Sequence, residues 1–517
     1  MKIENKSTRN KRIAKNTLYL YLRMAFVTIV SFFTARITLQ ILGVEDFGIQ
    51  NVVTSIVSFI GIFTGALTSA TQRFFAFDLG KNDIVLFKKT FSSIFFLFLT
   101  ITISLTFIAA LIGPWCIQNY LTIPTQRLSA AVYTFYFSLI SLAASMMLVP
   151  FSSAIIAYER MGAFARLSIF DACGKLVVIY LLYICNSDKL VTLAALNSFF
   201  QICLLAFYAI YCKTKLKGCK ISFSHDKSLY KELTTYIGWN IFGYGAGMLC
   251  TIGINICLNV FFGPITNAAK GIADKINQLT SQLNVNFFMA FSPQIIKSYA
   301  SQDMADAHML VYKSSKYSFL LILFVALPLI IGMQDVLSIW LGQAYVTQDM
   351  ILFCQWTLIF SLVNTLESPI TTLIRATGDI KKYQITVGTT TILTVPICIC
   401  LFIFGFPAIY SMIAWTLVYA ITQYCRLVIA HKQVGISITK YNKNVIMPLL
   451  YVSLTSLITV KFANKLLVYD GLVHLICITL ICFTITIITT YTIGLTNGER
   501  RKIKDKLQSL KHKTLKI

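Results

Sequence analysis

The chain has 517 residues, of which 56% are hydrophobic and 13% are charged, and its mean hydropathy is +0.72. The charged share is about half of that in soluble globular proteins, which excludes a soluble fold. A net charge of +25 would suggest a nucleic-acid partner in a soluble protein. No nucleic-acid-binding motif accompanies the charge, so we expect no nucleic-acid partner and assign the excess to cytoplasmic loops.

Apolar segments of about 20 residues recur along the whole chain, and each is long enough to cross a bilayer core as a helix. We therefore predict an all-α polytopic membrane protein with about fourteen transmembrane helices. In chain order the predicted spans are residues 17–42, 48–72, 90–112, 128–157, 167–185, 190–212, 236–262, 265–296, 315–335, 350–375, 383–404, 408–430, 445–464 and 472–494.

The distribution of basic residues sets the orientation. With the N-terminus inside, 36 Lys and Arg residues fall in cytoplasmic loops and tails, against four in outer loops. If the span at 265–296 were instead an amphipathic helix on the membrane surface, every later segment would invert and 18 of these residues would move outside. We therefore predict that 265–296 crosses the membrane and that both termini are cytoplasmic.

The eighth span is unusually polar for a membrane helix. Its apolar stripe at helical spacing comprises Ile265, Ala269, Ile272, Ile276, Leu279, Leu283 and Phe287. Opposite this stripe lie Lys270, Asp274, Asn277, Gln278 and Ser281. A charge that faces lipid costs several kcal/mol, so we predict that this polar face lines water or substrate.

Other charges also lie within the predicted spans. Arg23 is close enough to the cytoplasmic end to extend its head group to the interface, so this interpretation and a cavity role both stay open. Arg36 lies 13 residues deeper and points about 140° away from Arg23. Asp171 and Lys175 are spaced to pair with each other. Glu367 has no local partner, which leaves a proton site or a hidden ion pair as alternatives.

The basic residues outnumber the acidic ones within these spans. The basic side chains are Arg23, Arg36, Lys175, Lys270 and Lys275, and the acidic ones are Asp171, Asp274 and Glu367. This excess favours an anionic ligand over a cationic one.

Weak internal similarity indicates two copies of a six-helix unit. Gly43 and Gly263 are 220 residues apart, Gln72 and Gln294 are 222 apart, and residues 152–162 resemble residues 368–378. Because six is even, the copies have the same orientation and are related by an axis along the membrane normal. We expect a cavity between the lobes. The predicted regions are a first lobe at 1–212, a basic cytoplasmic linker at 213–235, a second lobe at 236–432, two extra spans at 433–496 and a basic cytoplasmic tail at 497–517.

The segments LGVEDFGIQNVVTSIVSF (42–59) and ALTSATQRFFAF (66–77) resemble the start of Wzx-type polysaccharide flippases of the multidrug/oligosaccharidyl-lipid/polysaccharide (MOP) superfamily. The resemblance implies alternating-access transport of undecaprenyl-pyrophosphate-linked oligosaccharides to the periplasmic leaflet of a bacterial inner membrane. It implies membrane lipids, a polysaccharide polymerase and the chain-length machinery as further partners.

The resemblance also assigns residues. In the family, basic residues of spans one and eight line a cationic cavity. Arg36 matches the span-one position best, Lys270 and Lys275 lie in the matching region of span eight, and Arg23 is a looser match. The cavity-lining or coupling candidates are Asp274, Gln278, Ser281 and Glu367.

Two other functions stay as alternatives. A MATE-like cation-coupled multidrug exporter shares the fold but needs acidic residues, and Asp274 and Glu367 keep it open. A membrane-embedded polysaccharide polymerase or ligase usually has a large periplasmic loop, whereas every predicted outer loop here is short. We therefore expect no enzyme activity, and neither a cofactor nor a metal.

Overall fold

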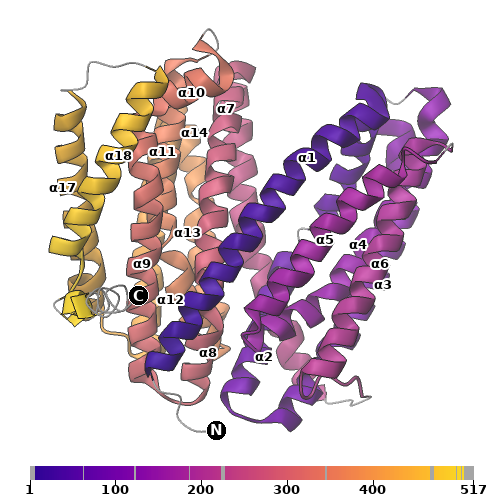
Figure 1. Cartoon of the computed structure of the whole chain (residues 1–517), viewed down its shortest axis with the longest axis horizontal. Helices are drawn as coiled ribbons and strands as arrows, with labels where there is room; N and C mark the ends of the chain where they lie inside the picture. Colours follow the sequence, from indigo (N-terminus) through magenta and orange to yellow (C-terminus); the bar gives the residue numbers. More distant parts are fainter. Residues whose placement is uncertain are drawn as a thin grey trace, which may run out of the picture. The chain divides into compact units, whose positions relative to one another are not determined.

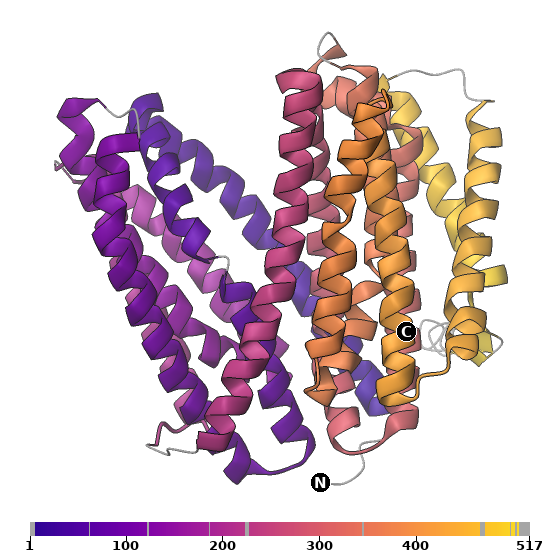
Figure 2. The same cartoon turned by 180° about the vertical axis from the view of Figure 1, so that it is seen from behind.

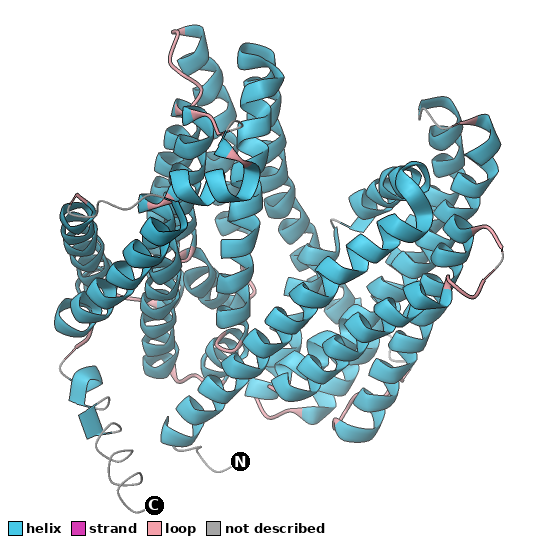
Figure 3. Ribbon diagram, turned by 45° about the horizontal axis from the view of Figure 1, so that its top comes forward, coloured by secondary structure: helices cyan, strands magenta, loops and turns pink. Residues whose placement is uncertain are grey.

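The computed structural model describes residues 6–61, 63–120, 124–185, 187–222, 227–343, 346–465, 471–496, 498–501 and 504–505. Most of the predicted tail at 497–517 and residues 223–226 of the predicted linker lie outside the described residues. The described residues form helices joined by short turns and contain no strand (Figure 3). The all-α prediction is confirmed.

The chain divides into two compact units. The first comprises Met1–Tyr244, Met289–Asp303 and Gly378–Ile380, and the second comprises Gly245–Phe288, Met304–Thr377 and Lys381–Ile517. The helices of unit 1 are α1 (Lys6–Gly61), α2 (Phe63–Gly80), α3 (Ile84–Tyr120), α4 (Leu128–Ala157), α5 (Met161–Leu181), α6 (Lys189–Lys215), the start of α7 (Lys227–Met289) and α8 (Ser292–Ala300). Unit 2 holds the rest of α7, α9 (Met304–Ile331), α10 (Met333–Leu341), α11 (Gln348–Asn364), α12 (Glu367–Thr377), α13 (Lys381–Ile392), α14 (Thr394–Ile403), α15 (Tyr410–Val434), α16 (Ile438–Tyr441), α17 (Met447–Asn464) and α18 (Gly471–Thr489).

Ten helical segments among the described residues are long and apolar enough to cross a membrane. They correspond to the predicted spans three, four, six, seven and nine to fourteen. The other four predicted spans, at 17–42, 48–72, 167–185 and 265–296, overlap α1, α2, α5, α7 and α8. The ninth helix begins at Met304, eleven residues before the predicted start, because the polar residues of its first turns continue the helix.

The glycines that suggested a repeat have the same unusual backbone. α1 is broken at Gly43, with φ 78° and ψ 172°, and α7 is broken at Gly263, with φ 79° and ψ −175°. Both φ values lie in the left-handed region, which only glycine adopts at little cost. In Figure 1, α1 begins and α2 ends at the lower end of unit 1, so the chain reverses direction between these two points.

The turns that follow α2 and α8 repeat in the same way. Asn82 has φ 56° and Gln302 has φ 62°, and these two residues are also 220 apart. The amide of Lys81 donates to the carbonyl of Phe77 at 3.0 Å, and the amide of Ser301 donates to the carbonyl of Lys297 at 2.9 Å. The same hydrogen bond at the same shift is independent support for two copies of one unit.

The packing of unit 1 gives a role to Asp46, the second acidic residue of the segment LGVEDFG (42–48). Asp46 accepts a hydrogen bond from Nε of Arg127 at 2.8 Å, and Nη1 of Arg127 donates to Asp188 at 2.6 Å. Asp188 also caps the start of α6 by accepting from the amide of Leu190 at 3.0 Å. This ion-pair cluster joins α1, α6 and the turn before α4 at the predicted outer end.

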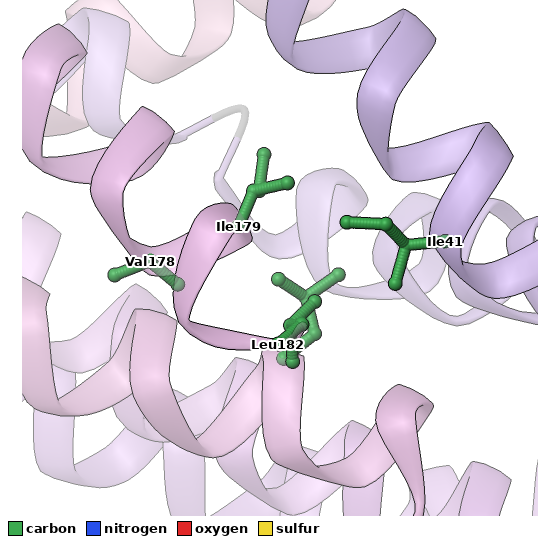
Figure 4. Packing of buried hydrophobic residues seen from close by; sticks show 5 residues of the cluster. Ile41, Val178, Ile179 and Leu182 are labelled. Atoms are coloured by element: carbon green, nitrogen blue, oxygen red, sulfur yellow. The ribbon is translucent and has the colours of Figure 1, made fainter. Parts of the chain in front are cut away.

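Beside that cluster, α1 packs against α5 and α6 through an apolar cluster (Figure 4). Ile41 from α1, Val178 and Ile179 from α5, and Leu182 and Leu193 are all buried there. Close van der Waals contact of this kind holds helices together where lipid replaces water. The first span is thereby fixed to its own unit just before the break at Gly43.

In unit 2, α17 and α18 pack against each other at the edge (Figure 2). At one end, Glu499 accepts hydrogen bonds from Nζ of Lys316 at 2.6 Å and from the hydroxyl of Tyr317 at 2.8 Å, both on α9. At the other end, His474 of α18 contacts Asp335 of α10 through Nδ1 at 2.5 Å. The two extra spans are therefore attached to α9 and α10 by polar contacts at both ends.

Candidate functional site

Lys270 is the most buried charge of the polar span. Its side chain is 1% exposed, and its Nζ pairs with Asp274 one turn along α7. The ammonium also lies 5.1 Å from the ring centroid of Trp415 on α15, within range of a cation–π contact. We expected Lys270 on an open polar face, whereas the structure buries it and leaves Asp274, at 35% exposure, as the accessible member of the pair.

The other polar side chains of this face of α7 fall into two groups, one packed against a neighbouring helix and one exposed. The Oδ1 of Asn277 accepts hydrogen bonds from Ser361 of α11 at 3.0 Å and from Ser281 at 3.4 Å. Lys275 and Gln278 are exposed. The helix thus uses part of its polar face to pack against α11, because buried amides and hydroxyls need partners. Sequence periodicity alone could not separate these two parts.

Glu367 forms a hidden ion pair, one of the two alternatives that the sequence left open. Its Oε1 accepts from Nη2 of Arg426 at 3.0 Å, and its Oε2 accepts from the hydroxyl of Tyr419. Arg426 is one of the 36 basic residues assigned from the sequence to the cytoplasmic side, although it falls within the predicted span 408–430. The structure places it inside α15 with 2% of its surface exposed. The helix continues to Val434, so Arg426 is more than two turns from its end.

An aromatic stack connects these two ion pairs within unit 2. Trp415 stacks on Phe360 with ring centroids 4.3 Å apart, and Phe360 meets Tyr419 edge-on at 4.9 Å. Tyr419 in turn contacts Glu367, and Trp415 contacts Lys270. Rings packed in this way have few alternative rotamers, so the stack holds both charged groups in fixed positions.

Arg23 lies in unit 1 and is held by α5. Its Nη1 donates to Ser168 at 3.4 Å, and its guanidinium lies 5.0 Å from the ring centroid of Phe164. These contacts fit a packing role as well as a cavity role. The side chain of Arg36 lies outside the described residues.

Asp171 and Lys175 of α5 form the ion pair that their spacing predicts. Nζ of Lys175 lies 2.9 Å from the carboxylate of Asp171, so these residues satisfy each other, as their spacing indicated. Their side chains are 48% and 29% exposed, respectively, in contrast to Lys270.

No family model and no curated protein matches the sequence. Solved structures do match its fold. One is the outward-facing conformation of a multidrug resistance MATE family transporter of the MOP superfamily, with 12% identity and a TM-score of 0.72 over 83% of this chain and 96% of that chain. A MATE protein in the straight conformation matches with 13% identity, a TM-score of 0.71 and the same coverage.

A third match is a MOP superfamily transporter from Pyrococcus furiosus, described by a reverse polarity of its binding pocket that suggests a different function. It has 11% identity and a TM-score of 0.73, again over 83% of this chain and 96% of that chain. At these identities the matches establish the architecture. The chain has the polytopic helical fold of the MATE-type transporters in the MOP superfamily.

Proposed function

We propose that this protein is an alternating-access transporter that moves an anionic lipid-linked oligosaccharide from the cytoplasmic to the outer leaflet of a bacterial inner membrane. Capsule, O-antigen or exopolysaccharide assembly would use such a step. The fold supports transport. Support for an anionic substrate comes from one observation, which is that the acidic residues of the predicted spans are all ion-paired.

These pairs are Asp171 with Lys175 at 2.9 Å, Asp274 with Lys270, and Glu367 with Arg426 at 3.0 Å. An exporter of organic cations needs a carboxylate that is available to the cation. Here each carboxylate already neutralises a basic group, and the sequence holds further basic residues in the spans. The balance of charge therefore favours an anion.

Lys270 gives this proposal a mechanism. A pyrophosphate head group carries at least two negative charges and can replace Asp274 as the partner of the Lys270 ammonium. Lysine suits this exchange because it is a compact charge that does not require the bidentate geometry of arginine. A membrane potential that is negative inside adds about 2.3 kcal/mol per charge per 100 mV to outward movement of the anion. No covalent step is involved, so transport requires no catalytic residue.

The first test compares ligands and variants of the purified protein in lipid nanodiscs. The probes are undecaprenyl pyrophosphate, uncharged undecaprenol and the organic cation tetraphenylphosphonium. We expect the pyrophosphate to bind, Lys270→Met to weaken that binding at least tenfold, and the matched control Lys175→Met to stay within twofold. Binding of the cation alone, with no effect of Lys270→Met, would instead support the MATE-like exporter that the multidrug relative suggests.

The second test is in the cell that makes the surface polysaccharide. We expect Arg36→Ala and Lys270→Ala to reduce the amount of polysaccharide at unchanged protein abundance. Arg36→Lys should retain more activity than Arg36→Ala, because a phosphate needs the charge first and the guanidinium fork second. Asp274→Asn should largely retain transport if Asp274 only balances Lys270, whereas complete loss would indicate a coupling proton on Asp274.

A further inference from the structure

Within unit 1, α2 and α8 cross at very short range. A Cβ atom built on Gly80 would lie 2.7 Å from Cβ of Ala300 and 2.8 Å from Cα of Lys297, so only glycine fits at this crossing. Gly80 and Ala300 are 220 residues apart, which is the shift that relates the turns after these helices. Equivalent residues that touch each other lie at a local two-fold axis, so α2 and α8 are a symmetric pair.

A buried carboxylate beside this crossing holds α8. Glu159, in the turn between α4 and α5, has a side chain that is 4% exposed. It accepts hydrogen bonds from Lys297 at 2.7 Å and Gln294 at 2.9 Å, both on α8, and pairs with Arg12 of α1 at 2.8 Å. We call these four residues the Glu159 cluster. Burial alone would raise the pKa of Glu159, but Lys297 and Arg12 hold the pKa below its ordinary value, so the carboxylate is charged at neutral pH.

The backbone indicates that the Glu159 side chain is itself required. Glu159 has φ 58°, a left-handed conformation that is unfavourable for residues other than glycine. The turn between α12 and α13 has Gly378, with φ 85°, so the backbone matches Gly378 with Glu159, 219 residues earlier, whereas the sequence comparison of 152–162 with 368–378 matches it with Gly162. There, Nη2 of Arg73 from α2 lies 2.6 Å from the position of a Cβ, so a side chain at 378 would require the Arg73 guanidinium to move.

The two copies thus use the same contact in different ways. In the first contact, Arg73 of α2 lies against the turn at Gly378. In the second contact, Gln294 and Lys297 of α8 donate hydrogen bonds to the Glu159 carboxylate. A charged, buried contact is strong only while its geometry is kept, because separating the partners leaves a buried charge without a partner. The Glu159 cluster therefore favours two states, one with its ion pairs fully formed and one with them fully separated, over intermediate geometries.

We propose that Glu159 is a positioning residue whose cluster locks α8, at the predicted cytoplasmic end of the eighth span, onto α1 and the turn between α4 and α5, and that this lock must release in each transport cycle. The inference rests on the proposed function only in that release serves transport. The lock itself is a property of the protein without substrate.

Hydrogen exchange measured by mass spectrometry on the substrate-free, full-length protein tests the lock. The reporter is the peptide that covers 292–303, and the reference is a peptide from α6. We expect Glu159→Gln to accelerate exchange in 292–303 at least tenfold and to leave the reference within twofold. The matched control is Glu232→Gln, since Glu232 is a 59% exposed carboxylate that lies 3.6 Å from Arg73, and it should leave both peptides unchanged.

A second variant excludes a folding defect in the turn. Glu159→Gly removes the carboxylate but suits the left-handed backbone, so it should match Glu159→Gln in 292–303. Unchanged exchange in both variants would overturn the lock. Equal acceleration in 292–303 and α6 would also overturn it, because Glu159 would then stabilise unit 1 as a whole. Both variants should change the transport rate at least threefold while undecaprenyl pyrophosphate binds within twofold of the unaltered protein.

Discussion

Replacing Asp274 by asparagine is the sharpest test of the buried charge in α7. The substitution keeps the shape of the side chain but leaves the Lys270 ammonium, 1% exposed, without its counter-charge. Breaking a buried ion pair from one side costs about 3–5 kcal/mol. The cation–π contact with Trp415, at 5.1 Å, is present with and without the substitution and cancels in the difference. Because Asp274 is 35% exposed, we expect a loss at the lower end of this range, about 3 kcal/mol.

The Asp171–Lys175 pair is the matched comparison, because it has the same spacing on one helix but exposed side chains. Exposed pairs of this kind contribute about 0.2–1 kcal/mol, so Asp171→Asn should cost under about 1 kcal/mol. The assay is thermal unfolding of each purified variant in the same nanodiscs and at one scan rate. With about 2 °C per kcal/mol for a domain of this size, we expect a fall of roughly 6 °C for Asp274→Asn and under about 2 °C for Asp171→Asn.

The double variant Lys270→Met with Asp274→Asn completes the cycle. It removes the charge that Asp274→Asn leaves unpaired, so it should recover most of the lost stability. Equal falls for Asp274→Asn and Asp171→Asn would refute the reasoning, since burial would then make no difference. A double variant as unstable as Asp274→Asn would show that the side-chain shapes matter more than their charges.

The remaining predictions concern topology and two further ion pairs. An impermeant thiol reagent added outside should label a cysteine at Asn119 and not one at Lys217, both of which are exposed, and labelling at 217 would contradict the fourteen-span layout. Glu367→Gln should destabilise the protein by about 3 kcal/mol because Arg426, 2% exposed, loses its carboxylate, and a stability equal to that of the unaltered protein would show that the pair is dispensable. Burial alone would raise the pKa of Glu499, but its hydrogen bonds lower that pKa to about 2. The contribution of Glu499 to the stability of the folded protein is therefore complete above about pH 5 and is lost as the pH falls toward 2. The difference in unfolding temperature between the protein and Glu499→Gln should shrink over that interval, and a constant difference would contradict the assignment.

Several features of the fold followed from the sequence because they depend on local pattern. Apolar length located the spans, since a helix must bury its backbone polar groups throughout the bilayer core. The glycines at 43 and 263 marked the breaks in two helices, because a left-handed backbone leaves few alternatives to glycine. The spacing of Asp171 and Lys175 predicted their ion pair, since residues four apart share a helix face.

The charged contacts between distant residues had no such local signal. Glu367 and Arg426 are 59 residues apart, so no local spacing indicates that they pair. Lys270 was expected on a wet face, yet packing against Trp415 buries it.

The sequence by itself determined that this is a polytopic helical membrane protein built from two similar halves, since apolar length and repeat spacing act along the chain. Only the tertiary structure decided which charges pair across long distances in the sequence. Glu159 makes this plain, because its partners on α8 lie 135 and 138 residues away and its left-handed turn is not marked by glycine. A buried charge selects its partner through space, and that selection is made when the helices pack.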